Sequence, residues 1–425
     1  MAAPQLERNL GVFGAVMMGM GSIVGTGVFV SIGIAADIAG SSVLLAVMAG
    51  ALLASFNGLS SAQLAANHPV SGGTYEYGYV YLSPLWGFVA GWLFLLAKSA
   101  SAATAALGFA GYTLSALGIS GDVWRLPLAL AALLLLTAIV LAGIRRSNSA
   151  NIVIVSLTLL ALLVFVAAGI PSAWRNGVAM LQPFFGSSQP GRDTLQATAL
   201  MFVAYTGYGR IATLGEEVHD PRRTIPRAII TALFLTMLLY MAVTGVALLT
   251  IGAPALGEAS AQAAPLERVA LHIGLPGVAT LLAIGAVTAM LGVLLNLLLG
   301  LSRVLLAMAR RGDMPLRFAQ LNATGTTPTA AVLAVALLIG FITLWGDVRT
   351  TWSFSAFTVL SYYAITNLAA LRLSAQQRFF PAWLSWLGLL CCLLLAFFVA
   401  PQIWLLGLGL IALGLLWRWL FRRFG

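Results

Sequence analysis

Long apolar runs separated by short polar breaks occupy almost the whole chain. About 20 apolar residues suffice for a helix to cross the hydrocarbon core of a bilayer, and a helix satisfies its own backbone hydrogen bonds there. The pattern therefore predicts an all-α membrane protein with twelve transmembrane helices. The predicted spans lie near residues 11–35, 41–65, 86–115, 126–143, 151–170, 194–215, 228–251, 276–306, 329–345, 350–371, 383–400 and 402–420.

The composition agrees with this pattern and excludes other classes of protein. Of the 425 residues, 60% are hydrophobic and 8% are charged, whereas a soluble domain carries about 25% charged residues. The formal net charge is +10, but no basic cluster marks a soluble domain. We therefore expect the lipid bilayer as a partner and no nucleic acid. No metal-ligand spacing or catalytic constellation is found, so we expect no metal, no cofactor and no enzymatic activity.

The arginines predict the orientation. If the N-terminus is cytoplasmic, fifteen arginines fall on the cytoplasmic side and five on the opposite side, as the positive-inside rule requires. The tally supports an even number of spans and a multi-pass protein of the plasma (inner) membrane with both termini cytoplasmic. The fifteen are Arg8, Arg145, Arg146, Arg222, Arg223, Arg227, Arg303, Arg310, Arg311, Arg317, Arg372, Arg378, Arg418, Arg422 and Arg423. The five are Arg125, Arg175, Arg192, Arg268 and Arg349.

The first span carries three closely spaced glycines, Gly21, Gly25 and Gly27. Each weakens a helix interior by about 1 kcal/mol relative to alanine. A break there frees backbone groups at membrane depth, where they are tolerated only beside a cavity or a ligand. The alternative is close helix packing through small residues at Gly21 and Gly25.

The sixth span repeats the feature in residues 204–210, Ala-Tyr-Thr-Gly-Tyr-Gly-Arg. Spans one and six occupy corresponding positions in two halves of five spans, and an odd number of spans inverts the second half. Interrupted helices in such positions mark a transporter site. Half-helix N-termini favour an anion and freed carbonyls favour an ammonium group, so the pattern indicates a zwitterionic amino acid.

Four stretches together resemble the amino acid–polyamine–organocation superfamily of permeases, which has the leucine-transporter fold. They resemble its broken first helix, its first cytoplasmic loop and third helix, its sixth helix with the loop after it, and the end of its eighth helix. They are residues 21–29; 68–75 with 84–92; 204–209 with 216–218 and 220–228; and 302–310 with 312–315.

The resemblance implies a single transmembrane transporter domain over residues 1–425. Residues 11–171 would form the first inverted repeat, residues 194–371 the second, and residues 383–420 two additional helices. It implies secondary active transport of amino acids across the plasma membrane by alternating access. A polyamine or organic-cation transporter of the same fold, or a non-transporting nutrient sensor, is the alternative.

The resemblance also implies a substrate site at the two unwound helix centres. The substrate carboxylate would meet backbone N–H groups around Thr26 and Gly27. The ammonium would meet carbonyls near Ile23, Val203 and Thr206. The predicted substrate-binding residues are Ile23, Gly25, Thr26, Gly27, Val203, Tyr205, Thr206, Gly207 and Tyr208.

Two tyrosines of this set, Tyr205 and Tyr208, are predicted to act in side-chain selectivity or gating. Packing aromatics are the alternative for each of them. The sequence departs from the family next to them: many relatives carry an acid where Gly209 stands, and Arg210 follows here. Arg210 would bind an anionic group or brace the broken helix.

The ion-coupling group also departs from the family. Some proton-coupled relatives carry a lysine in the fifth helix where Thr158 stands. Lys98 instead lies in the third span, about a dozen residues or roughly 18 Å beyond Trp86. An ionisable residue at that depth is a functional-site hypothesis; a lysine facing a wet cavity and bonded to carbonyls is the alternative. We expect coupling to H⁺ rather than Na⁺, or exchange.

Overall fold

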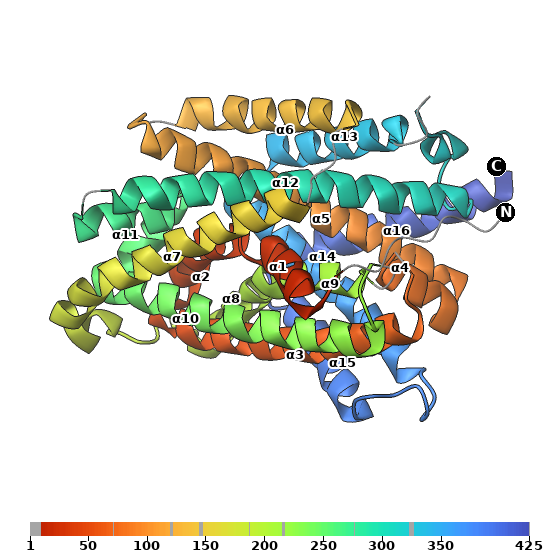
Figure 1. The fold of residues 1–425 in the computed structure, drawn as a ribbon, viewed down its shortest axis with the longest axis horizontal. Coiled ribbons are helices and arrows are strands. Elements are labelled where there is room, and N and C mark those ends of the chain that lie inside the picture. Colours follow the sequence, from red (N-terminus) through yellow and green to blue (C-terminus); the bar gives the residue numbers. More distant parts are fainter. Residues whose placement is uncertain are drawn as a thin grey trace.

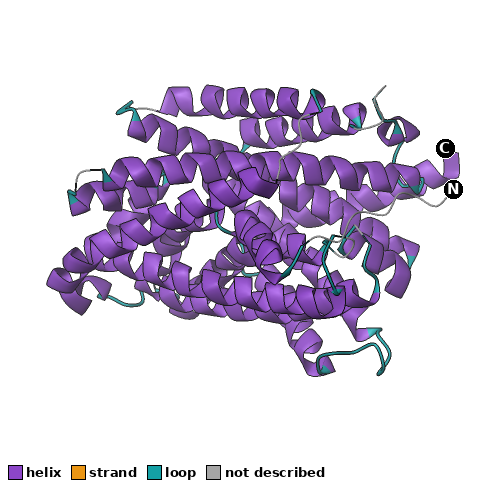
Figure 2. Cartoon of the chain, viewed as in Figure 1, coloured by secondary structure: helices purple, strands orange, loops and turns teal. Residues whose placement is uncertain are grey.

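The structure is a computed structural model that describes residues 10–70, 72–119, 122–143, 148–186, 188–214, 217–275, 277–322 and 327–424. Helices make up nearly all of the described chain, as Figure 2 shows. Three arginines of the orientation tally, Arg8, Arg145 and Arg146, lie outside the described residues. The α-helices are α1 (Val12–Ile23), α2 (Ile32–Ala39), α3 (Val43–Asn67), α4 (Thr74–Tyr77), α5 (Pro84–Ala116), α6 (Arg125–Leu141), α7 (Asn148–Asn176), α8 (Pro190–Tyr205), α9 (Gly209–Ala212), α10 (Pro221–Ser260), α11 (Pro265–Ile273), α12 (Val278–Arg310), α13 (Thr329–Trp345), α14 (Val348–Leu371), α15 (Ala382–Ala396) and α16 (Pro401–Phe424).

Seven helices in the described part of the chain are long and apolar enough to cross a membrane. They are Gly27–Asn67, Pro84–Ala116, Ser149–Leu181, Pro221–Ser260, Val278–Arg310, Val348–Leu371 and Pro401–Arg423. Four shorter apolar helices, α1, α6, α13 and α15, fall on further predicted spans. The all-helical membrane architecture is therefore confirmed, while the count of twelve stays a prediction.

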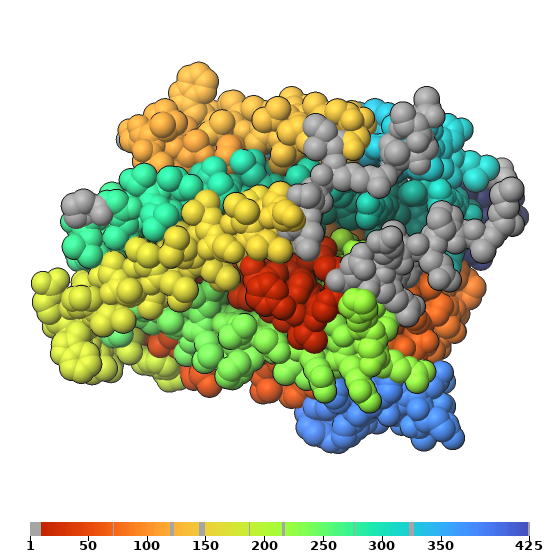
Figure 3. All heavy atoms as spheres, viewed as in Figure 1, coloured from red at the N-terminus to blue at the C-terminus, as the bar shows by residue number. Residues whose placement is uncertain are grey.

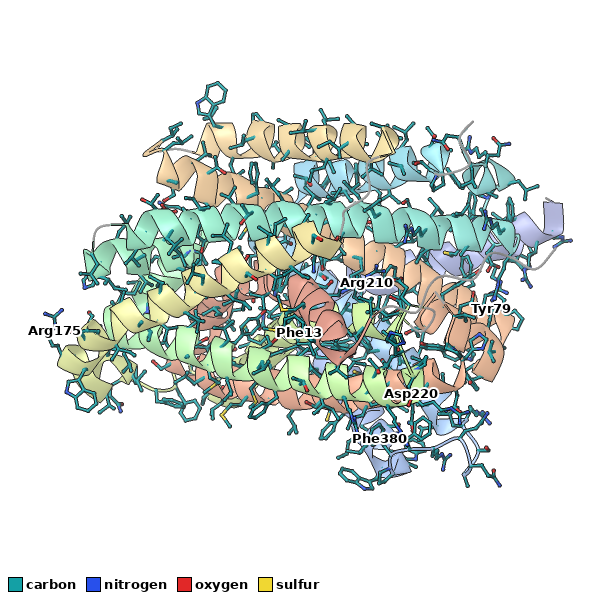
Figure 4. All side chains as sticks on the ribbon, viewed as in Figure 1. Phe13, Tyr79, Arg175, Arg210, Asp220 and Phe380 are labelled. Atoms are coloured by element: carbon teal, nitrogen blue, oxygen red, sulfur yellow. The ribbon has the colours of Figure 1, made fainter. Side chains whose placement is uncertain are left out.

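The long helices run side by side along the bundle (Figure 1). α10 leads to α11 at one end, and α12 returns to the opposite end, where α16 also ends. Arg175, on the predicted outer side, lies at the α11 end of the bundle (Figure 4). Arg175 and the ends of α12 and α16 therefore lie at opposite ends of the bundle, while the assignment of either end to the cytoplasm stays a prediction.

Burial separates central helices from peripheral ones. In α5 and α14, 83% of the most apolar window is buried, against 17% in α16. α5 contacts both α12 and α14, and its many alanines, glycines and serines allow such close approach. Ser83 caps α5 by accepting a hydrogen bond from the Trp86 N–H. α5 therefore forms the central wall of the bundle.

Both predicted interruptions are present. α1 ends at Ile23, and helix resumes as a wide π-type turn at Gly27–Ser31 before α2. α8 ends at Tyr205 and continues through a 3₁₀ turn, Thr206–Tyr208, into the single turn of α9. α1 packs between α7 and α10 on the face drawn in Figure 3. The first helix is thus held on both sides while its centre is unwound.

Candidate functional site

The two interruptions meet each other in the middle of the bundle. A Cβ atom on Gly207 would lie 2.2 Å from the Ser22 carbonyl oxygen. A Cβ atom on Gly27 would lie 2.5 Å from the Ala204 Cβ and 2.7 Å from its Cα. Backbone atoms cannot move aside as flexible side chains do, so only glycine permits these approaches. The glycines of the two breaks therefore bring the two backbones into contact.

A small cavity of about 50 Å³ lies beside this contact. One water takes up about 30 Å³ of liquid volume, and ligand pockets typically measure about 300–1,000 Å³. The cavity is therefore too small to hold an amino acid, and a substrate would bind there only after helices move. The lining residues are Ser22, Ile23, Thr26, Gly27, Lys98, Ser101, Val203, Ala204, Thr206, Gly207, Val293, Leu297 and Trp352.

The polar side chains of the lining differ in whether they are already paired. Ser22 donates to the Met18 carbonyl at 3.2 Å, and Ser101 bonds Ser355 at 2.7 Å. Thr26 is buried, and its hydroxyl has no hydrogen-bond partner among the described residues. An unpaired buried hydroxyl costs about 1–3 kcal/mol. The Thr26 hydroxyl is therefore the group in the lining that a ligand would most readily pair.

Lys98 faces the cavity from the central helix α5. Its Nζ donates to Thr206 Oγ1 at 3.0 Å, and the Thr206 hydroxyl in turn donates to the Val203 carbonyl at 2.8 Å. The lysine thus extends a chain of hydrogen bonds that holds the second break. Among the described residues, the lining contains no aspartate or glutamate to neutralise it.

Two tyrosines that sequence reasoning missed cap the carbonyls freed by the breaks. The Tyr240 hydroxyl, from α10, lies 2.9 Å from the Ile23 carbonyl and 3.3 Å from the Ala204 carbonyl. The Tyr363 hydroxyl, from α14, donates to the Thr206 carbonyl at 3.2 Å. Both tyrosines are buried. The sequence signal that could have identified them is a tyrosine hydroxyl in the middle of a long apolar span.

The structure brings most of the predicted substrate-binding residues together. The cavity lining includes Ile23, Thr26, Gly27, Val203, Thr206 and Gly207, together with Lys98.

Three predicted residues lie outside the lining. Gly25 packs on α12, where a Cβ atom would lie 2.7 Å from a methyl group of Val293. Tyr205 donates to the Val47 carbonyl of α3 at 3.2 Å. The Tyr208 ring packs on the Tyr363 ring at 5.4 Å. These contacts agree with the packing alternative for both tyrosines.

Neither of the other two predicted coupling residues reaches the cavity. Arg210, labelled in Figure 4, is exposed on α9, within electrostatic reach of Glu217 and Arg303. Thr158 is buried in α7 and donates to the Ile154 carbonyl at 2.8 Å. In the described part of the chain, no group of three or more histidine, cysteine or acidic side chains could hold a metal ion.

The α11 end of the bundle is closed by a tyrosine of α5. The Tyr112 hydroxyl donates to the Phe29 carbonyl at 2.8 Å and accepts from the Leu266 N–H at 3.3 Å. Next to Leu266, burial raises the pKa of Glu267 to about 7, although a hydrogen bond with Ser115 lowers it in part. α11 is therefore fastened directly to the segment that follows the first break.

The opposite end is closed by a polar cluster around Asp313, whose side chain is buried. The Tyr75 hydroxyl donates to its carboxylate at 3.2 Å, and Tyr79 bonds the same oxygen. The Arg422 guanidinium lies 3.6 Å from the other oxygen. This cluster links the segment after α3, the end of α12 and the C-terminal helix α16.

Comparison with known proteins settles the family. The sequence profile of the family described as amino acid permease matches residues 14–422. The chain belongs to this family. The resemblance inferred from the four stretches is thereby confirmed.

Individual relatives are similar over most of the chain. The sequence is 39% identical to an uncharacterised transporter of Mycobacterium tuberculosis, covering 96% of this chain and 91% of that protein. It is 29% identical to the branched-chain amino acid permease BcaP of Bacillus subtilis, covering 88% and 83%. It is 30% identical to cationic amino acid transporter 4 of Homo sapiens, covering 86% and 60%. The family and these relatives are permeases and transporters, so the chain is a multi-pass membrane transporter and not an enzyme.

Proposed function

We propose that the protein is a secondary active transporter that moves amino acids across the plasma membrane by alternating access. The observation that carries the proposal is the small cavity between two broken helices, with an unpaired Thr26 hydroxyl in its wall. Membrane proteins tolerate irregular backbone at this depth where it surrounds a ligand site. The cavity is too small for an amino acid as it stands, which supports a closed state of a protein that must open.

The substrate carboxylate would bind the backbone N–H groups and hydroxyl around Thr26 and Gly27. The ammonium would bind the carbonyls of Ile23, Val203 and Thr206. Each of these carbonyls already accepts one hydrogen bond, and each has a second lone pair for the substrate. Gly25, Tyr205, Gly207 and Tyr208 would shape the two breaks.

The proposed architecture is that of the leucine transporter, with twelve spans and cytoplasmic termini in a single domain, residues 1–425. Residues 11–171 and 194–371 form the inverted repeats, and residues 383–420 add two helices. The ends of α12 and α16 lie on one side of the bundle and α11 on the other, which supports this topology.

We also propose that transport is coupled to H⁺ or proceeds by exchange. Thr158 offers no titratable group, whereas Lys98 faces the cavity and would take that role. Arg210 would act in gating through Glu217 and Arg303, since it lies outside the cavity. A polyamine carrier is disfavoured because the described residues of the lining include an ammonium group and no carboxylate.

Uptake of labelled amino acids into proteoliposomes tests the proposal. The parent should accumulate at least one amino acid above empty liposomes. Thr26→Ala should raise KM about tenfold, as expected when one hydrogen bond to a charged group is lost. Thr343→Ala is the matched control, because that buried hydroxyl bonds its own helix in α13 at 2.8 Å. Uptake of polyamines but not amino acids, or binding without transport, would favour one of the two alternatives instead.

A further inference from the structure

The Thr26 hydroxyl of the cavity is unpaired, whereas three carbonyls of the two breaks already accept one hydrogen bond each. The carbonyls of Ile23, Ala204 and Thr206 each face a tyrosine hydroxyl. The Thr26 hydroxyl, by contrast, has no partner among the described residues. An ammonium group has three protons to donate, and the hydrogen bond from Lys98 to Thr206 uses one. Lys98 therefore has donors to spare, and the Thr26 hydroxyl can donate as well, so a ligand with several hydrogen-bond acceptors would pair both groups.

The charge of Lys98 points in the same direction. Lys98 is the only lysine in the sequence, and it lies near the middle of α5. The four ion pairs found among the described residues, Arg223–Asp220, Arg311–Glu76, Arg349–Asp37 and Arg422–Asp313, lie elsewhere. Lys98 is partly buried, and a cation withdrawn from water without a counter-charge is costly. The cavity thus carries a positive charge that no described residue of its lining neutralises.

The net charge of the occupied cavity then differs among three classes of amino acid. A substrate with an acidic side chain brings one net negative charge and leaves the occupied cavity neutral. A neutral zwitterion leaves one positive charge, and a cationic amino acid leaves two in a confined, poorly hydrated space. Like charges brought together across a desolvated contact are strongly disfavoured.

We propose that the substrate is an acidic, dicarboxylic amino acid whose side-chain carboxylate binds the Lys98 ammonium while its α-carboxylate binds at Thr26 and Gly27. This inference rests on the proposed function and adds the substrate class. It separates the chain from a relative that is named for cationic amino acids.

The test compares initial uptake of labelled L-glutamate with that of its neutral isostere L-glutamine and of L-lysine into proteoliposomes. The parent should prefer glutamate to glutamine in kcat/KM by about tenfold or more, because a charge-assisted hydrogen bond is gained, and it should transport lysine least. Lys98→Gln should remove the preference for glutamate. Lys98→Arg, which keeps the charge, should retain most of it. Using the ratio of two substrates within one variant cancels differences in protein amount and in any rate change common to both substrates.

Arg175→Gln is the control variant. It removes one positive charge from an exposed position at the far end of the bundle (Figure 4), so the preference should stay unchanged. Because the chain has a single lysine, an amine-reactive reagent followed by mass spectrometry reports on Lys98 directly, and L-glutamate should protect it from modification.

Two results would overturn the inference: a parent that transports glutamine or lysine better than glutamate, or a Lys98→Gln variant that keeps the preference for glutamate. A parent that transports no amino acid of any class is a different outcome, and it would overturn the proposed function itself.

Discussion

Both broken segments contain glycines and lie in the middle of the bundle, but they differ in the side chains that pair their polar groups. At the second break, the Thr206 side chain accepts from Lys98 and donates to Val203, and its carbonyl is capped by Tyr363. At the first break, Tyr240 caps the Ile23 carbonyl, but the Thr26 hydroxyl is left unpaired. The second break is therefore braced by more side chains, and the first keeps a free hydroxyl that faces the cavity. The Tyr208 hydroxyl of the second break also lacks a partner among the described residues, but Tyr208 lies outside the lining.

The difference shows how a membrane protein stabilises irregular backbone in the middle of the membrane. Every uncapped polar group there is costly, so side chains from surrounding helices pair most of the groups that the breaks release. The group that stays unpaired then marks where binding energy is available.

Replacing Gly207 should have the largest effect, because it breaks the contact between the two segments. In Gly207→Ala the new Cβ would lie 2.2 Å from the Ser22 carbonyl oxygen. We expect uptake to be abolished. Gly245→Ala in α10 is the control, since its Cβ would meet nothing within 4 Å. If Gly207→Ala transported like the parent, the close approach of the two breaks would be wrong.

The two capping tyrosines should differ in their contribution to stability. Tyr240→Phe removes a hydroxyl that serves carbonyls of both breaks, whereas Tyr363→Phe uncaps one carbonyl of the second break. Leaving a buried acceptor unpaired costs about 1–3 kcal/mol. Thermal unfolding in detergent should show the lower midpoint for Tyr240→Phe. Equal midpoints would mean that the first break does not depend on Tyr240.

Arg210→Gln should alter the rate of transport rather than substrate affinity. Arg210 is exposed on α9 and does not line the cavity, so KM should stay within about twofold. Loss of a partly screened surface charge interaction is worth about 0–1 kcal/mol, so kcat should fall only a few-fold. A large rise in KM would instead place the guanidinium at the substrate.

Glu267 should make stability weakly dependent on pH. Burial raises its pKa from 4.5 to about 7 in the folded state, so the folded state binds the proton more tightly than the unfolded chain. The contribution is fully present below about pH 4.5 and is lost as pH rises through about 7. As the pH is raised from 5 to 8, the unfolding midpoint of the parent should therefore decrease relative to that of Glu267→Gln. If the plots of unfolding midpoint against pH were parallel for the two proteins, Glu267 would not be the source of the pH dependence.

Much of the fold followed from local sequence signals. Seven helices of the described chain are long and apolar enough to cross a bilayer on their own, and glycines weaken a helix wherever they occur. Both interruptions therefore appeared where the glycines near residues 25 and 207 predicted them. Four stretches with family character were sufficient to predict the family that comparison then confirmed.

The site itself depended on contacts between distant segments. The sequence alone determined where the chain spans and where it breaks, because hydrophobic length and glycine content act within a few residues. Only the tertiary structure decided that Tyr240 caps Ile23, 217 residues away, and that Lys98 bonds Thr206, 108 residues away. It also decided that Tyr205 and Tyr208 pack outside the cavity. Such pairings arise from the mutual orientation of packed helices, and no periodicity within a single helix encodes the rotation of its neighbour.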